Sequence, residues 1–117
     1  MSKPRSKLVA KADKDFRLVK GVPVVLHFGK QTKHMPGHIN FIPGKSIITL
    51  GIGELQRLVE DKVGTGTWKS KYKEQVDFES VIGIYVNPKT GDAIPTTVGI
   101  VHYSKSGLHV VPASPNS

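Results

Sequence analysis

The chain has 117 residues, a length that suits one domain with a modest core. It carries 17 lysines and arginines against 9 aspartates and glutamates, and the resulting net charge of +8 points to a polyanionic partner. The absence of cysteine excludes a disulfide framework, a thiolate metal site and a cysteine nucleophile, and no run is apolar for the roughly 20 residues of a membrane span.

Most of the excess charge lies in residues 1–20, which contain seven basic and two acidic residues for a net charge of +5. We expect this segment to form a basic N-terminal arm, with weak helical character from Leu8 to Val19. A basic arm can serve solubility alone, or it can make sequence-independent contacts with a phosphate backbone. Both interpretations stay open at this point.

A second basic group surrounds Tyr72, just after Trp68, and consists of Lys69, Lys71 and Lys73. Their spacing of two residues places them on one side of the chain if this segment is extended. Lysines beside aromatic rings suit contact with nucleic acid. The alternative is a mobile loop that carries lysines without a role in binding.

The central part of the chain predicts one strand, one irregular stretch and one helix. Val22–Phe28 is apolar and β-branched, and Pro23 places it at an edge or at a strand start. Residues 29–45 are rich in Gly, Pro and His and predict an irregular stretch of a length that is often functional. Apolar residues then recur at helical spacing and predict an amphipathic helix over about 52–62, with Thr49 as its cap.

Three further segments predict strands, namely Asp77–Val86, Ile94–Tyr103 and Leu108–Val111. A turn signal over residues 87–92 separates the first two, and a turn over residues 104–107 separates the last two. Helix is scarce at the front of the chain and sheet is abundant at the back. The pattern therefore predicts the α+β class with an antiparallel sheet.

Two histidines, His102 and His109, flank the last predicted turn. If residues 105–106 form a two-residue loop, His102 lies opposite His109. If residues 106–107 form the loop instead, His109 lies opposite Ser104. Both registers place the two histidines on one face of the sheet, whereas a three-residue loop would separate them. They are candidates for a shared site, with ordinary strand residues as the alternative.

The other histidines precede the helix. His34 lies in the irregular stretch beside Lys33. His34 and His38 have the spacing of a helical metal pair, but a Pro-Gly pair between them disfavours a helix and no acidic residue accompanies them. His27 falls in the apolar segment and is expected to be a core residue. We therefore expect no metal site and no cofactor.

Histidine, lysine and hydroxyl groups are the candidate catalytic set. Metal-free RNA cleavage needs a base for the 2′-hydroxyl, an acid for the leaving 5′-oxygen, and cations or donors for the charged transition state. Positioned carboxylates, which two-metal nucleases and glycosidases need, are scarce in the same stretches. The available groups are His34, His102, His109, Lys33, Lys45, Lys105, Ser46, Thr96, Thr97 and Tyr103.

A series of short motifs is more specific than the composition. In chain order they are KQTKH at 30–34, GKS at 44–46, ELQRLV at 54–59, GTG at 64–66, IGIYV at 82–86, TT at 96–97 and IVHYSKSGLHVVP at 100–112. In this order and spacing the chain resembles the polymorphic toxin type 50 domain. That family is found at the C-termini of bacterial toxin proteins and in some phage head-associated proteins.

The resemblance covers about residues 22–113 and implies a helical N-terminal part packed on a four-stranded antiparallel sheet, with RNA bound across the sheet. It implies an RNase of the barnase/EndoU/colicin/RelE-like superfamily that works without a metal and leaves a 2′,3′-cyclic phosphate. It carries functional roles onto His34, Lys45, Ser46, Thr97, His102 and His109. Which histidine is the base and which the acid stays open.

The resulting prediction is an endoribonuclease toxin with a basic arm at 1–20, an RNase domain at 21–113 and a tail at 114–117. In this hypothesis His34 and His102 are the acid/base pair. Lys45 binds the scissile phosphate, and Thr97 and His109 position it. Contacts with RNA are expected from Lys33, Ser46, Tyr103, Lys105, Lys69 and Lys71.

The expected partners are an RNA substrate and a cognate immunity protein, acidic to match the +8 charge. No membrane association is expected. The expected place of action is the cytoplasm of a target cell after delivery, either as an excised or standalone protein or as part of a larger secreted toxin. The alternative is a non-catalytic nucleic-acid-binding or phage head-associated module. An unrelated metabolic enzyme ranks last, because nucleotide-binding and nucleophile signatures are missing.

Overall fold

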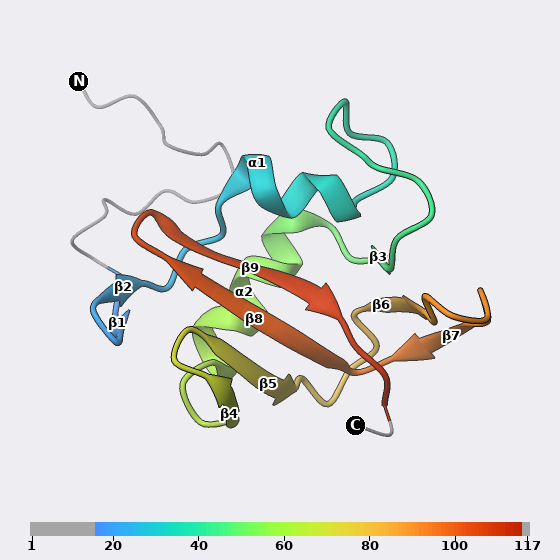
Figure 1. The fold of residues 1–117 in the computed structure, drawn as a ribbon. Helices are drawn as coiled ribbons and strands as arrows, with labels where there is room; N and C mark the ends of the chain where they lie inside the picture. Colours follow the sequence, from blue (N-terminus) through green and yellow to red (C-terminus); the bar gives the residue numbers. More distant parts are fainter. Residues whose placement is uncertain (1–15, 116–117) are drawn as a thin grey trace.

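The computed structural model describes residues 16–115, and Figure 1 shows its fold. The described chain is α+β, with short helices and mostly antiparallel strands, which confirms the predicted class. The helices are α1 (Phe28–Gln31), the 3-10 helix η2 (Thr32–His34) and α2 (Ile52–Lys62). The strands are β1 (Leu18–Val19), β2 (Val22–Pro23), β3 (Ile47–Ile48), β4 (Thr67–Ser70), β5 (Lys73–Asp77), β6 (Gly83–Val86), β7 (Ala93–Thr96), β8 (Val98–Ser104) and β9 (Gly107–Pro112).

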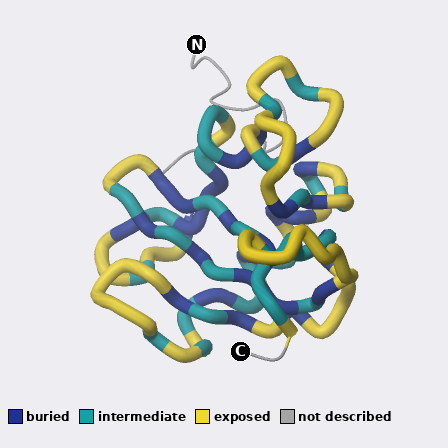
Figure 2. The backbone as a smooth tube through the Cα atoms, turned by 45° about the vertical axis from the view of Figure 1, so that its right-hand side comes forward, coloured by how far each residue is buried: buried dark blue, intermediate teal, exposed yellow. Residues whose placement is uncertain are grey.

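The central element is a four-stranded antiparallel sheet in the order β4-β5-β8-β9. Alternation along the strands divides its side chains between two faces. One face, including Val101 and Tyr103 of β8 and Leu108 of β9, packs with Leu55 and Val59 of α2 into the hydrophobic core. The predicted four-stranded sheet is thus present, with α2 behind β8 and β9 (Figure 1). Exposed residues gather in the loops and turns around this buried centre (Figure 2).

Helix α2 has the predicted bounds, Ile52–Lys62. Ile52, Leu55 and Val59 are buried because their spacing puts them on one face of the helix. The cap, however, is Gly51 rather than the predicted Thr49. The Glu54 carboxylate accepts a hydrogen bond of 3.2 Å from the Gly51 N–H, so a side chain from the first turn satisfies the exposed end.

The predicted strand Asp77–Val86 is wrong as a single element, because the chain turns between β5 and β6. Glu79 has a left-handed φ of 64°, and its N–H donates to the Asp77 carboxylate at 2.9 Å. This turn sends the chain to a second sheet, of order β3-β6-β7. The predicted strand Ile94–Tyr103 is likewise two strands in two sheets, since Thr96 Oγ1 accepts from Val98 N–H and donates to the Ala113 carbonyl at the break.

The predicted strand Val22–Phe28 is also wrong beyond Pro23. Leu26 makes only a single parallel bridge to Leu108, and α1 begins at Phe28. The reason is a side chain: His27 Nδ1 accepts the Lys30 N–H at 3.2 Å and caps α1. The following stretch, predicted to be irregular, therefore starts with α1 and η2, and His34 ends a short helix rather than lying in a loop.

Residues 1–15 of the expected basic arm, with most of its expected helix, lie outside the described part of the chain. Arg17 and Lys20, at its end, are described. The Arg17 guanidinium donates to the carbonyls of Glu60 and Val63, both at 2.8 Å, at the end of α2. A cation there satisfies free carbonyls and the negative end of the helix dipole. Among residues 16–115, no helix has the length and apolar character needed to cross a membrane.

Candidate active site

His102 and His109 lie directly opposite each other on β8 and β9. Residues 105–106 form the two-residue loop, so this register of the two considered is the one present. Gly107 closes the turn with φ 134°, and a Cβ there would lie 2.4 Å from the Val25 carbonyl oxygen. The two rings are stacked, with centroids 4.7 Å apart and planes 11° from parallel. Because their neighbours Val101 and Leu108 point into the core, both histidines point to the other face of the sheet.

His34 joins this pair from outside the sheet. Its ring is stacked against that of His109, with centroids 6.4 Å apart and planes 14° from parallel. We call His34, His109 and His102 the histidine row, with His109 in the middle. The structure thus brings together three histidines, of which His34 and His109 are 75 residues apart in the sequence. The sequence predicts a shared face for His102 and His109 if the turn is a two-residue loop, and no local pattern places His34 beside them.

A hydrogen bond fixes the ring of His34. Its Nδ1 lies 3.0 Å from the Ser46 carbonyl oxygen. Because a carbonyl oxygen only accepts, Nδ1 carries the hydrogen, and Nε2 takes no part in this bond. The Ser46 side chain is occupied elsewhere, since its Oγ accepts the Val86 N–H at 2.9 Å. Ser46 therefore links η2 to the β3-β6-β7 sheet and orients His34.

The surroundings keep the two strand histidines neutral. Burial, with smaller contributions from charge on His102 and His34, lowers the pKa of His109 to about 3. Burial also lowers the pKa of His102, with smaller contributions from the Lys73 ammonium and from His34. At neutral pH His109 therefore has a free ring lone pair rather than a positive charge. The same influences favour the neutral form of His102.

Two lysines near the row were not predicted as site residues. Lys73 on β5 lies directly opposite His102 in the sheet register, so Lys73, His102 and His109 are cross-strand neighbours on one face. Lys30 of α1 is close enough for its charge to lower the pKa of His109. The sequence grouped Lys73 with Lys69 and Lys71, and only strand pairing shows that it belongs beside His102.

The predicted placement of Lys69, Lys71 and Lys73 on one extended segment is wrong. Lys69 lies on β4 and Lys73 on β5, because the chain reverses between Ser70 and Lys73. Lys69 and Lys71 are exposed near the turn end of this hairpin, and Lys105 is exposed in the β8–β9 turn. These three lysines are therefore gathered at one end of the central sheet, beyond the histidine row.

Lys33 directly precedes His34, and Lys45 directly precedes Ser46. Both lysines are exposed beside the site. Thr97 lies elsewhere, five residues before His102 and thus roughly 16 Å along the chain if extended. Its side chain hydrogen-bonds to Asp77, whose pKa is lowered by the Glu79 N–H and further by Thr97.

Tyr103 lies on the core face, opposite to the histidine row. Its hydroxyl donates to the fully buried Glu74 at 2.5 Å, and burial and that carboxylate raise its pKa. The remaining histidines are also outside the row. His27 caps α1, and His38 makes an edge contact with Phe28 at 5.6 Å between ring centroids. Within residues 16–115 no group of three histidine, aspartate or glutamate side chains is placed to hold a metal ion.

The fold and the site define a small α+β domain of a basic chain, with a histidine row on one face of an antiparallel sheet. Residues 26–112 match the family model described as bacterial toxin 50, which spans the helices and every strand of the central sheet. The chain belongs to the bacterial toxin 50 family and is therefore a polymorphic toxin domain. No curated protein matches it.

Proposed function

We propose that this toxin domain is a metal-independent endoribonuclease of the barnase/EndoU/colicin/RelE-like kind. The observation that carries the proposal is the line of Lys73, His102, His109 and His34 across one face of the sheet. It combines two groups suited to proton transfer with a cation for a phosphate, as RNA cleavage through the 2′-hydroxyl requires.

Proton transfer is assigned to the outer rings of the row. The pKa of about 3 makes His109 a weak base, and an efficient base has a pKa near the working pH. His109 serves instead as a neutral hydrogen-bond donor to the phosphate. A phosphate bound over His109 lies between His102 on one side and His34 on the other.

The environments of the outer rings give each a role. The lowered pKa of His102 favours its neutral form, which takes the proton of the 2′-hydroxyl. The Ser46 carbonyl accepts from His34 Nδ1–H and fixes the orientation of this ring, so we assign the role of the acid to His34, which donates from Nε2–H. As the 2′-oxygen bonds to phosphorus, the bond from phosphorus to the 5′-oxygen breaks and His34 protonates that oxygen. The product is a 2′,3′-cyclic phosphate and a free 5′-hydroxyl.

Lysines supply the positive charge around this phosphate. Lys73 lies beside His102, and Lys45 directly precedes Ser46, whose carbonyl holds His34. We assign transition-state charge to Lys73 and Lys45, and backbone contacts with flanking RNA to Lys33 and to the lysines at the sheet end, Lys69, Lys71 and Lys105. The hydroxyl of Thr97 is held by Asp77, so the positioning role falls to His109.

A toxin of this activity acts in the cytoplasm of the cell that receives it. Its producer needs an immunity protein, and an acidic one would match the basic chain. We expect that protein to cover the face that carries the histidine row, because this blocks RNA and neutralises Lys33, Lys45 and Lys73 together.

An RNA cleavage assay in EDTA tests the proposal. Wild type should produce fragments ending in 2′,3′-cyclic phosphate, and a 2′-deoxy nucleotide at the cleavage site should prevent the cut. His34→Ala and His102→Ala should each lower the rate by about 10² or more, the size expected for general acid–base catalysis.

His38→Ala is the matched control, because this histidine lies outside the row, and it should cut as wild type does. Intact RNA with wild type, or normal cutting by both row variants, would overturn the proposal. Salt-dependent RNA binding without cleavage would favour the alternative, a non-catalytic nucleic-acid-binding module.

A further inference from the structure

Three hairpin turns meet at one end of the central sheet and enclose a pocket of about 410 Å³. They are the β1–β2, β4–β5 and β8–β9 turns. Lys20 Nζ donates to the Lys71 carbonyl at 2.7 Å, and the Tyr103 N–H donates to the Tyr72 carbonyl at 2.9 Å, so the turns are tied together. The volume lies within the range of about 300 to 1,000 Å³ that is common for small-molecule sites.

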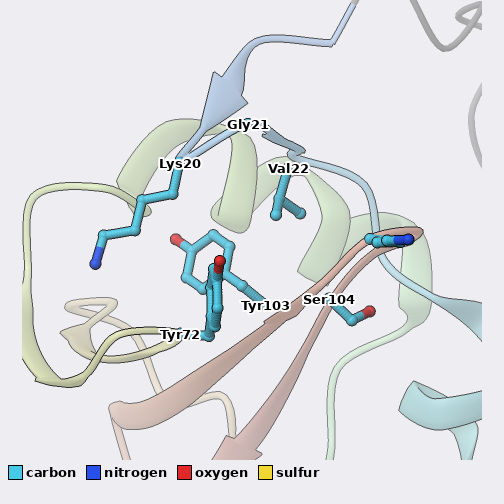
Figure 3. A pocket seen from close by; sticks show the side chains of 7 residues that line it. Lys20, Gly21, Val22, Tyr72, Tyr103 and Ser104 are labelled. Atoms are coloured by element: carbon cyan, nitrogen blue, oxygen red, sulfur yellow. The ribbon is translucent and has the colours of Figure 1, made fainter.

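Aromatic and apolar groups form the pocket wall. Figure 3 shows the rings of Tyr72 and Tyr103 beside Lys20, with Val22 nearby on β2. Tyr72 is 44% exposed and presents its ring to solvent, whereas Tyr103 is buried against Trp68 at 5.2 Å between centroids. An exposed tyrosine ring on a rigid aromatic support is a stacking surface for a planar ring.

The charged side chains that line the pocket are both lysines, Lys20 and Lys105. Lys20 is held in place, since its ammonium lies 3.7 Å from the centre of the Trp68 ring and the residue adopts a left-handed φ of 52°. The neighbouring acid, Glu74, is fully buried and bonded to the N–H groups of Gly64 and Gly66 as well as to Tyr103. The pocket therefore favours an anionic ligand with a planar ring.

Ser104 connects this pocket with the histidine row. It lines the pocket and lies two residues after His102 on β8, on the same face of the strand and about 7 Å along it. Tyr103 and Val22 line the pocket from the core side of the sheet, so a single strand whose phosphate contacts the row reaches the pocket by passing around this end of the sheet. Building on the proposed function, we propose that this pocket is a subsite for the nucleotide one position beyond the two that the cleaved bond joins, with its base stacked on Tyr72 and its phosphate between Lys20 and Lys105.

Substrate length tests the subsite. Wild type should cleave a tetranucleotide more efficiently than a dinucleotide, because only the longer substrate reaches the pocket. Tyr72→Ala should remove this advantage, a loss of roughly tenfold in kcat/KM for one base stack, and leave the dinucleotide rate unchanged. Tyr72→Phe keeps the ring and should keep the advantage. Lys89→Ala, in the exposed β6–β7 turn, is the matched control.

A binding measurement separates the subsite from the catalytic proposal. Trp68 is the single tryptophan and lies behind Tyr103, so its fluorescence reports on this pocket. Titration with a 2′-deoxy tetranucleotide, which cannot be cleaved through the 2′-hydroxyl, should change the signal, and Tyr72→Ala should weaken binding roughly tenfold. Unchanged affinity in Tyr72→Ala, or an equal loss on dinucleotide and tetranucleotide, would overturn the subsite. Absence of cleavage with this binding intact would overturn the catalytic proposal alone.

Discussion

The side-chain amide of Gln31 makes both hydrogen bonds to the main chain of Val110 that a neighbouring strand would make. Its Oε1 accepts the Val110 N–H at 2.7 Å, and its Nε2 donates to the Val110 carbonyl at 2.9 Å. Gln31 is fully buried, so these bonds are shielded from water. They close the outer edge of β9 and fix the end of α1, from which η2 brings His34 beside His109.

Replacement of Gln31 by leucine should destabilise the domain. The volume is similar, but two buried main-chain groups of Val110 lose their partners, at about 1 to 3 kcal/mol for each group left unsatisfied. Urea unfolding should show a total loss of about 2 to 6 kcal/mol. Lys89→Leu, an exposed change in the β6–β7 turn, is the control and should change stability little. A free energy of unfolding within 0.5 kcal/mol of wild type in Gln31→Leu would contradict this account of the edge.

Even the conservative replacement of Glu74 by glutamine should destabilise the domain. It accepts from the N–H groups of Gly64 and Gly66 and from the Tyr103 hydroxyl, and all three are donors. Glu74→Gln turns an NH₂ group toward one of them and should cost about 1 to 3 kcal/mol in unfolding free energy. Tyr103→Phe, which removes one donor and leaves the others paired, should cost less. The reverse order of the two losses in urea unfolding would contradict the assigned hydrogen bonds.

Stability should fall with acidification because of His109. Its folded-state pKa of about 3 lies below its ordinary value of 6.5, so between these values the unfolded state binds the proton more strongly. Unfolding free energy therefore rises with pH in that window, by at most about 1.4 kcal/mol per pH unit for one group. His109→Gln removes this contribution. The unfolding free energy of wild type should therefore fall relative to that of His109→Gln from pH 7 to pH 5. A constant difference between the two proteins would contradict the prediction.

Removal of the Lys73 charge should raise the pKa of His102. The ammonium faces this ring across the sheet and disfavours its protonated form. In Lys73→Met, titration of the His102 ring followed by NMR should move toward higher pH. The acidic limb of the pH–rate profile should move with it if His102 is the base. Lys89→Met controls for the change in net charge, and an equal shift in both variants would show that Lys73 has no specific effect.

Some features follow from local sequence alone. Helix α2 has the predicted bounds because its apolar residues recur at helical spacing. This spacing alone shows which face of the helix packs against the core. The β8–β9 hairpin is equally local, since a two-residue turn fixes which residues pair. With a two-residue loop, the sequence by itself predicts His102 and His109 on one face, and the family motifs extend over most of the chain.

Tertiary contacts decided the rest. Gln31 bonds to a strand 79 residues away, and no local pattern shows that its amide replaces a strand and carries His34 to His109. Lys73 reaches His102 only through the pairing of β5 with β8. The breaks near Glu79 and Thr96 depend on hydrogen bonds that divide two apolar runs between two sheets. Residue type and spacing determined which groups were available, whereas long-range hydrogen bonding and strand register decided which of them meet.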